Sequence, residues 1–281
     1  MTTKQKYRVS SSTSTVQNGK AVCQVDQQAG WVAIGGGGRV DCPNCRYGAF
    51  LKGSRPYSGD ISQGWEVVAA DHLYANDYYV SCQIIGIRIK GVSQQELRNA
   101  ISVTPQNSIA GHTPSVDATV PSGQILVGGG AWVHDEQSYG GPGTGIAGGY
   151  LWSTSPSTNK AASWNAASKD HQVACIHQVT SYAIGIKPTF SNGVTLDGRI
   201  GSNLQWISTG GSEVIVNGNT DYAPTSAGAL ANWDAPNGGR MLLNSELGNN
   251  LYQSATAFSC DNLYISSGVT TSYILELAKH H

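Results

Sequence analysis

Two stretches of the chain share a Trp that is followed six residues later by an Asp-His pair, a combination able to bind a sugar. In a β-strand the Trp and Asp side chains would share one face, with the His on the other. An indole stacks on the apolar face of a pyranose, while a carboxylate accepts hydrogen bonds from the hydroxyls. The alternative is a repeated core Trp with a repeated Asp-His turn clamp. The candidates are Trp65, Asp71 and His72, and Trp164, Asp170 and His171.

A second group of candidates lies in loops that follow glycine-rich segments. Three related positions in the chain carry unlike loops there, at residues 39–46, 131–145 and 230–238. Repeat scaffolds place function in such loops, so aromatic and polar side chains in them predict ligand contacts. The alternative is that they are variable surface turns. These candidates are Trp132, His134, Asp135, Tyr139, Trp233 and Asp234.

Other motifs do not favour catalysis, a metal or a cofactor. The runs Gly35–Gly38 and Gly128–Gly130 lack the Gly-Lys-Ser/Thr of a phosphate loop and indicate close backbone approach or a bulge. Cys42-Pro-Asn-Cys45 has zinc or redox spacing, but zinc needs two further ligands and no second Cys pair exists. Plain thiols or a local disulfide are favoured. No His lies in a nucleophile-elbow or zinc-protease motif. We therefore expect no enzyme, no metal and no cofactor.

The elements that position these residues come from an internal repeat. The Trp-Asp-His blocks lie 99 positions apart, from 65 to 164, and so do the Gly-centred blocks at 86 and 185. A third copy is fainter: Ser226-Ala-Gly-Ala229 replaces the triple glycine, and Tyr252 is matched to the Trp, with no Asp-His pair. A single domain, 1–281, is predicted, with repeats at about 8–92, 101–190 and 200–279 and a tag remnant at 280–281.

Each repeat predicts short β-strands, because apolar runs of strand length are bounded by Gly, Pro, Asn and Ser. One capping box, Ser93-Gln-Gln-Glu96, indicates at most a single helical turn, since its counterpart in the second copy favours a turn and strand. Three such units would bury their apolar faces by packing three sheets around a pseudo-threefold axis. The expected fold is an all-β prism, with a β-propeller or a β-trefoil-like fold as alternatives.

A family resemblance points the same way. The segment from Cys42-Pro through Phe50-Leu-Lys52, then Asp71-His72 and Ile84–Ile89, resembles one repeat of the vitelline membrane outer layer proteins. Those are three-repeat β-prisms related in sheet arrangement to jacalin-type lectins. The resemblance implies a prism and sugar binding, and it transfers no site residue. Asp-His stands here where that family has paired acidic residues.

Composition narrows the class of partner. Only 12% of residues are charged, against about 25% in an average domain, and the net charge is −1. No basic run occurs, so nucleic acid is not an expected partner. No apolar run long enough for a transmembrane segment is present. No signal peptide is recognisable, and the six cysteines leave the redox compartment open, so the location is undetermined, with an extracellular one possible.

Together these features predict a non-catalytic, lectin-like protein whose partner is a glycan or a cell-surface receptor. One alternative is a component of a secreted toxin, insecticidal or haemagglutinating. Another is a structural coat or matrix protein. If the Trp-Asp-His pattern binds ligand, the valency should be two. If the loops bind, the three faces should differ in specificity.

Overall fold

The protein is all-β, as the sequence predicts. The computed structural model describes residues 6–14, 19–41, 49–71, 78–134, 148–170, 174–207, 211–233, 239–248, 253–261 and 267–280. Strands form almost all of the regular structure in these residues, and the only α-helix among them is short. None of the helices in this part of the chain has the length and apolar character needed to cross a membrane.

The strands fall into three sets of six along the chain. The first set is β1 (Lys6–Ser14), β2 (Gly19–Cys23), β3 (Val32–Asp41), β4 (Ala49–Pro56), β5 (Trp65–Asp71) and β6 (Tyr78–Ile87). The second set is β7 (Ile101–Asn107), β8 (Ser115–Thr119), β9 (Ile125–His134), β10 (Gly149–Pro156), β11 (Ser163–Asp170) and β12 (Gln178–Ile186). The third set is β13 (Thr195–Ile207), β14 (Ser212–Asn217), β15 (Ala223–Trp233), β16 (Arg240–Leu247), β17 (Ser254–Asp261) and β18 (Gly268–His280).

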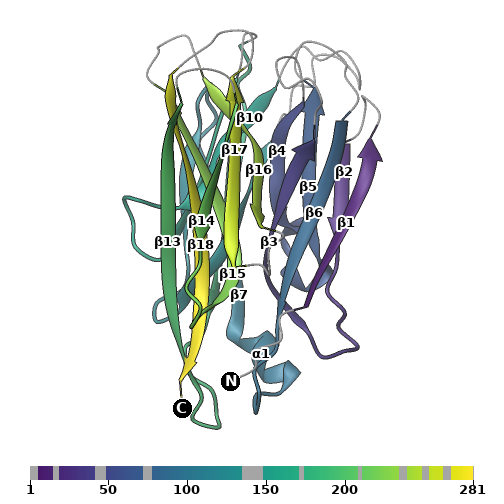
Figure 1. Ribbon diagram of the computed structural model, residues 1–281, viewed down its shortest axis with the longest axis vertical. Coiled ribbons are helices and arrows are strands. Elements are labelled where there is room, and N and C mark those ends of the chain that lie inside the picture. Colours follow the sequence, from purple (N-terminus) through teal and green to yellow (C-terminus); the bar gives the residue numbers. More distant parts are fainter. Residues whose placement is uncertain are drawn as a thin grey trace.

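Every sheet is shared between two of these sets. Sheet I has the order β1-β6-β3-β16-β17-β14, sheet II β2-β5-β4-β9-β12-β7, and sheet III β13-β18-β15-β10-β11-β8. The sequence led us to expect one sheet for each unit. Instead each set of six strands divides between two sheets, and the pairings within each sheet are antiparallel. The strands run along the long axis of the molecule, and β1 begins and β18 ends at its lower end (Figure 1).

The two halves of each sheet meet at a short contact that we call a seam. Each seam consists of two paired residues on each strand: β3 with β16, β4 with β9, and β10 with β15. A β-bulge interrupts β4, β10 and β16 just before the seam, and another interrupts β3, β9 and β15. Because a bulge bends its strand, the middle strands can turn toward the centre of the molecule. There β3, β9 and β15 contact one another, as do β4, β10 and β16.

The glycine runs lie at this centre and allow the close approach. A Cβ atom at Gly36 would overlap the Trp65 ring, and one at Gly129 would overlap the Trp164 ring. At Gly35 a Cβ would overlap the backbone of Thr225 in the third set. Only a residue without a side chain fits such positions, as the sequence predicted for these runs.

The third set keeps part of the pattern in a different register from the one expected. Residues that pair with the end of the preceding strand are Trp65, Trp164 and Ala255, so Ala255, and not Tyr252, takes the Trp position. By the same pairing, Asp261 occupies the place of Asp71 and Asp170. The sequence pattern did not reveal Asp261, because the third block contains no Trp and was aligned three residues too early, at Tyr252 in place of Ala255.

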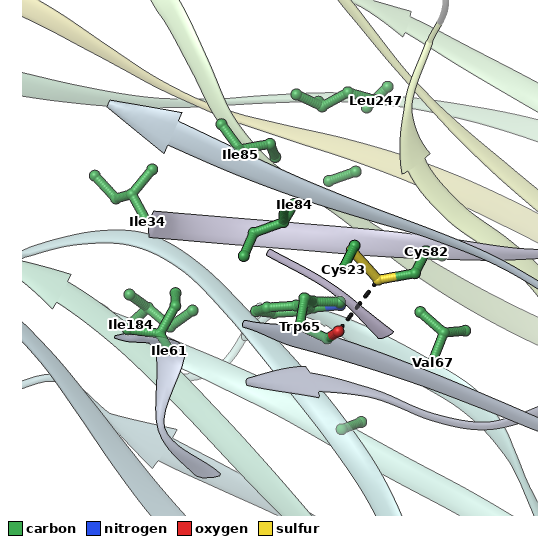
Figure 2. Packing of buried hydrophobic residues seen from close by; sticks show 14 of the residues in the cluster. Cys23, Ile34, Ile61, Trp65, Val67, Cys82, Ile84, Ile85, Ile184 and Leu247 are labelled. Carbon is green, nitrogen blue, oxygen red and sulfur yellow. Dashed lines mark hydrogen bonds between the residues drawn. A yellow bond between two sulfur atoms is a disulfide. The ribbon is translucent and has the colours of Figure 1, made fainter. Parts of the chain in front are cut away.

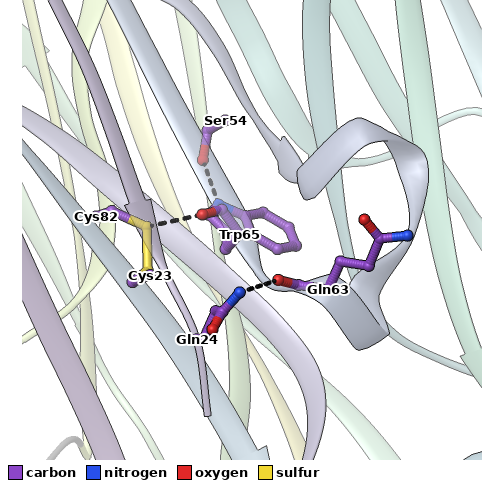
Figure 3. The surroundings of a disulfide bond; sticks show 6 residues. All are labelled: Cys23, Gln24, Ser54, Gln63, Trp65 and Cys82. Carbon is purple, nitrogen blue, oxygen red and sulfur yellow. Dashed lines mark hydrogen bonds between the residues drawn. A yellow bond between two sulfur atoms is a disulfide. The ribbon is translucent and has the colours of Figure 1, made fainter.

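A disulfide joins the two sheets of the first set. Cys23 on β2 of sheet II bonds to Cys82 on β6 of sheet I, and Cys82 Sγ lies 3.2 Å from the Trp65 carbonyl oxygen (Figure 3). Figure 2 shows the Trp65 ring beside this bond, within the buried cluster. Cys82 is therefore not available as a zinc ligand. Cys42 and Cys45 lie outside the described residues.

The helix is longer than expected. α1 spans Gln94–Ala100, with the Ser93 hydroxyl accepting a hydrogen bond from the Glu96 N–H, as the capping box predicts. Leu97 and Ala100 are buried. The counterpart segment between the second and third sets has no helix, so the expectation that equivalent linkers share one backbone was wrong. Burial of one apolar side of α1 stabilises it independently of the repeat.

We expect Gly36→Ala to destabilise the protein by about 1–3 kcal/mol, because the new methyl group must displace the buried Trp65 ring or the backbone. Chemical unfolding followed by fluorescence measures this change. Gly111→Ala is the matched control, since a Cβ there meets nothing within 4 Å. Equal unfolding midpoints for the two variants would contradict the packing argument.

Candidate functional site

The two Trp residues of the Trp-Asp-His pattern are core residues. Trp65 and Trp164 are both 0% exposed. The Trp65 Nε1–H donates to Ser54 Oγ at 2.9 Å, and the Trp164 Nε1–H donates to Thr154 Oγ1 at 3.1 Å. Neither ring presents a face to solvent, so the structure corrects their assignment as ligand contacts. They match the alternative that the sequence also allowed, in which the repeated Trp is a core residue.

One Asp of the same pattern, Asp170, acts as a local clamp through its carboxylate. Asp170 Oδ2 lies 2.7 Å from His112 Nδ1 and accepts the Cys175 N–H at 2.9 Å. Asp71 is buried, and its carbonyl oxygen accepts the Tyr150 hydroxyl at 2.6 Å. His72 and His171 lie outside the described residues. The Asp170 carboxylate therefore fixes the end of β11 to neighbouring segments.

Trp132 and His134, in contrast, lie on the accessible face of sheet II. Both are on β9 and half-buried. Trp132 pairs across the seam with Gly53 on β4, where a Cβ would overlap the indole. The ring therefore lies against β4. The sequence placed Trp132 and His134 in a loop, whereas the structure places them on a strand. Asp135 and Tyr139, which follow in the sequence, lie outside the described residues.

Arg55 holds the Trp132 ring in place. Its guanidinium carbon is 3.6 Å from the ring centroid, a cation–π contact. The same guanidinium donates to Tyr182 Oη at 2.9 Å and to Glu66 Oε1 at 2.8 Å. No local sequence signal indicates this role, because Trp132 and Tyr182 lie far from Arg55 along the chain.

Glu66 anchors Arg55 from below. It is 1% exposed and also contacts Lys20 Nζ at 2.8 Å and the Ser58 N–H at 3.1 Å. Burial alone would raise the pKa of Glu66. The bonds from Lys20 and Ser58 and the charge of Arg55 outweigh it and hold the pKa below the ordinary value. Glu66 is thus kept as a carboxylate, which fixes the guanidinium under Trp132.

A polar chain lies beside Trp132, where Thr180 of β12 pairs with Trp132 on one side and with Asn107 of β7 on the other. The Thr180 hydroxyl donates to Asn107 Oδ1 at 2.6 Å, and His134 Nε2 lies 2.6 Å from Thr180 Oγ1. Because the Thr180 hydrogen is already donated, His134 must donate from Nε2. We call Trp132, Arg55 and His134, which are half-buried, together with Tyr182 and Thr180, which are buried beside them, the Trp132 face.

Trp233 belongs to a different cluster, at the end of β15. Its ring makes an edge contact with Trp152, with centroids 5.4 Å apart, and Lys169 Nζ lies 4.5 Å from its centroid. Burial lowers the pKa of Lys169. Trp152 was not among the predicted residues, although it sits in a block that repeats the one containing Lys52. Asp234 lies outside the described residues.

The three seams share one backbone arrangement and carry different side chains. The residue opposite Gly53 in sheet II is Trp132, while Leu230 faces Ser153 in sheet III and Arg39 faces Asn244 in sheet I. An aromatic, an aliphatic and a charged residue thus occupy equivalent places. The seams therefore offer three surfaces of different chemistry.

Among the described residues, no group of three or more His, Cys, Asp or Glu side chains could hold a metal ion. No protein-family model matches the chain, and no curated protein matches it. Function is therefore argued from the geometry of the surfaces themselves.

Glu246, on β16 at the sheet I seam, gives a pH-dependent prediction. Burial raises its pKa from 4.5 to about 7, although Arg39 opposes the shift. The folded protein thus binds this proton more tightly than the unfolded chain, so its contribution is present below pH 4.5 and is lost as the pH rises through 7. At about 1.4 kcal/mol for each pKa unit, the loss is up to about 3 kcal/mol.

We expect Glu246→Gln to remove this loss, so the variant should be more stable than the parent at pH 8 and similar to it at pH 4.5. Unfolding curves at several pH values check this. Asp221→Asn, which changes an exposed carboxyl on a turn that does not contribute to the Glu246 pKa, is the control. A parallel pH dependence of Glu246→Gln and the parent would exclude Glu246 as the titrating group.

Proposed function

We propose that the protein is a non-catalytic, lectin-like binding protein that recognises carbohydrate through the Trp132 face. The observation that carries this is the half-buried Trp132 ring, which lies against Gly53 of β4 and is in cation–π contact with the Arg55 guanidinium. An aromatic ring fixed in this way loses little conformational entropy on binding. Its apolar surface suits the C–H face of a pyranose.

Hydrogen-bonding groups beside the ring suit the hydroxyls of the same ligand. The half-buried Arg55 and His134 lie beside the ring, and the buried Tyr182 and Thr180 hydroxyls hold them in position. An apolar platform with a few placed polar groups is the usual composition of a small-ligand site. The Glu66 and His134 contacts hold these groups in position.

We also propose that the three sets of six strands are diverged copies, over about residues 8–92, 101–190 and 200–279, arranged as a pseudo-threefold prism. Three features support this: the strand order within each half-sheet, the position of the bulges and the residues paired at each seam. Because the three copies would share one backbone and carry different side chains, their ligand specificities would differ. This is the outcome expected if the variable segments bind the ligand.

The disulfide supports a partner outside the cell. Disulfides persist in oxidising compartments and are rare in the cytosol. Cys23–Cys82 joins two sheets within the core, where it supports the fold. A glycan on a cell surface is the partner that fits both the compartment and the Trp132 face.

We expect Trp132→Ala to weaken glycan binding at least tenfold, because it removes the stacking surface, while Trp132→Phe keeps part of the affinity. A glycan array identifies the ligand, and calorimetry on the variants measures the loss. Trp206→Ala is the matched control, since that Trp is 65% exposed on β13, an edge strand of sheet III.

Two results would overturn the proposal. One is the absence of binding to any glycan at millimolar concentration. The other is an unchanged affinity in Trp132→Ala with the fold intact by circular dichroism.

A further inference from the structure

The accessible face of sheet I contains a hollow of about 250 Å³ at its seam, which we call the sheet I hollow. Residues of β3, β14, β16 and β17 line it. Its volume is below the roughly 300–1,000 Å³ of pockets for drug-sized ligands, so it suits one small ring. It lies on a different sheet from the Trp132 face.

Asn244 provides an acceptor in the wall of this hollow. Its side chain is almost completely buried, at 4% exposure. Its Nδ2 group donates to Thr256 Oγ1 at 3.0 Å and to Glu246 Oε1 at 3.4 Å. Its Oδ1 atom is buried and has no hydrogen-bond partner among the described residues. Buried acceptors are nearly always bonded to protein or water, so this one can accept a hydrogen bond from a water or from a ligand in the hollow.

Carboxyl groups outnumber cations around the hollow. Asp41 lies 2.5 Å from the Arg39 guanidinium, so these two charges balance. Glu213, from β14, is exposed at the rim, and Glu246 lies behind Asn244. The electrostatic interactions of Glu246 are with Arg39, Asp41 and Glu213. The net charge of these four side chains is negative. Their carboxyl oxygens can accept further hydrogen bonds from donors on a ligand.

An apolar wall completes the site. Phe258 on β17 is half-buried, and Leu243 on β16 is buried beside the seam. An aromatic ring attracts both the C–H face of a sugar and a cationic group near its own face.

We propose that the sheet I hollow binds the protonated amine of an amino sugar. An ammonium group has three donors and no acceptor, which matches the Asn244 oxygen and the excess of carboxylates. The sugar ring itself lies against Phe258. Neutral sugars lack the charge that the hollow selects, and simple amines lack the ring.

Saturation-transfer NMR titrations at pH 7 test this with glucosamine, glucose, N-acetylglucosamine and ethanolamine. Glucosamine should bind at least fivefold more tightly than each of the other three. Equal binding of ethanolamine would reduce the site to an amine site without ring selection, and equal binding of glucose or N-acetylglucosamine would remove the role of charge. Either outcome overturns the proposal.

Substitutions at the two sites test where glucosamine binds. Glu213→Gln and Phe258→Ala should each weaken glucosamine binding at least fivefold, whereas Asp221→Asn, the same loss of charge on an exposed turn, should not. Trp132→Ala should leave glucosamine binding unchanged. If Trp132→Ala abolishes it and Glu213→Gln does not, the sugar binds at the Trp132 face. The hollow is then excluded while the proposed function stands.

Discussion

The close approach of β3, β9 and β15 at the centre of the molecule is the contact on which the other packing depends. Glycines there let the Trp65 and Trp164 rings lie directly on the neighbouring strand, and let one backbone reach another. Any side chain at those positions would separate the sheets. The Trp rings in turn fill the space between the two sheets of their own set, with each indole N–H satisfied inside the core. The same two rings therefore fill the core and have their polar N–H groups hydrogen-bonded.

The short seams follow from this centre. Since the middle strands bend at their bulges, they pair with the next set over only two residues before they separate. The backbone contact is therefore small and tolerant of sequence, and the outward side chains at the seam are free to differ. This explains how one scaffold carries a stacked Trp132 in sheet II and an acidic hollow in sheet I.

The sequence predicted the strands and the structural role of the glycine runs because alternation and turn residues are local signals. The capping box correctly predicted the start of α1. Its length was underestimated because the matching segment of the second repeat favours a turn and strand. The third block of the sequence pattern was aligned three residues too early, because Ala255 stands where the first two blocks have a Trp. Trp152 and Arg55 were missed, since their partners are distant along the chain.

By itself, the sequence determined an all-β chain with a repeated pattern, a low surface charge and aromatic residues near its strand ends. The tertiary structure decided which aromatics are core and which are surface. Trp65, Trp164 and Trp132 all look like ligand contacts in the sequence. The difference arises because burial depends on what the opposite strand offers. A glycine from another sheet covers Trp65, while Gly53 and Arg55 of the neighbouring strand leave Trp132 half-exposed.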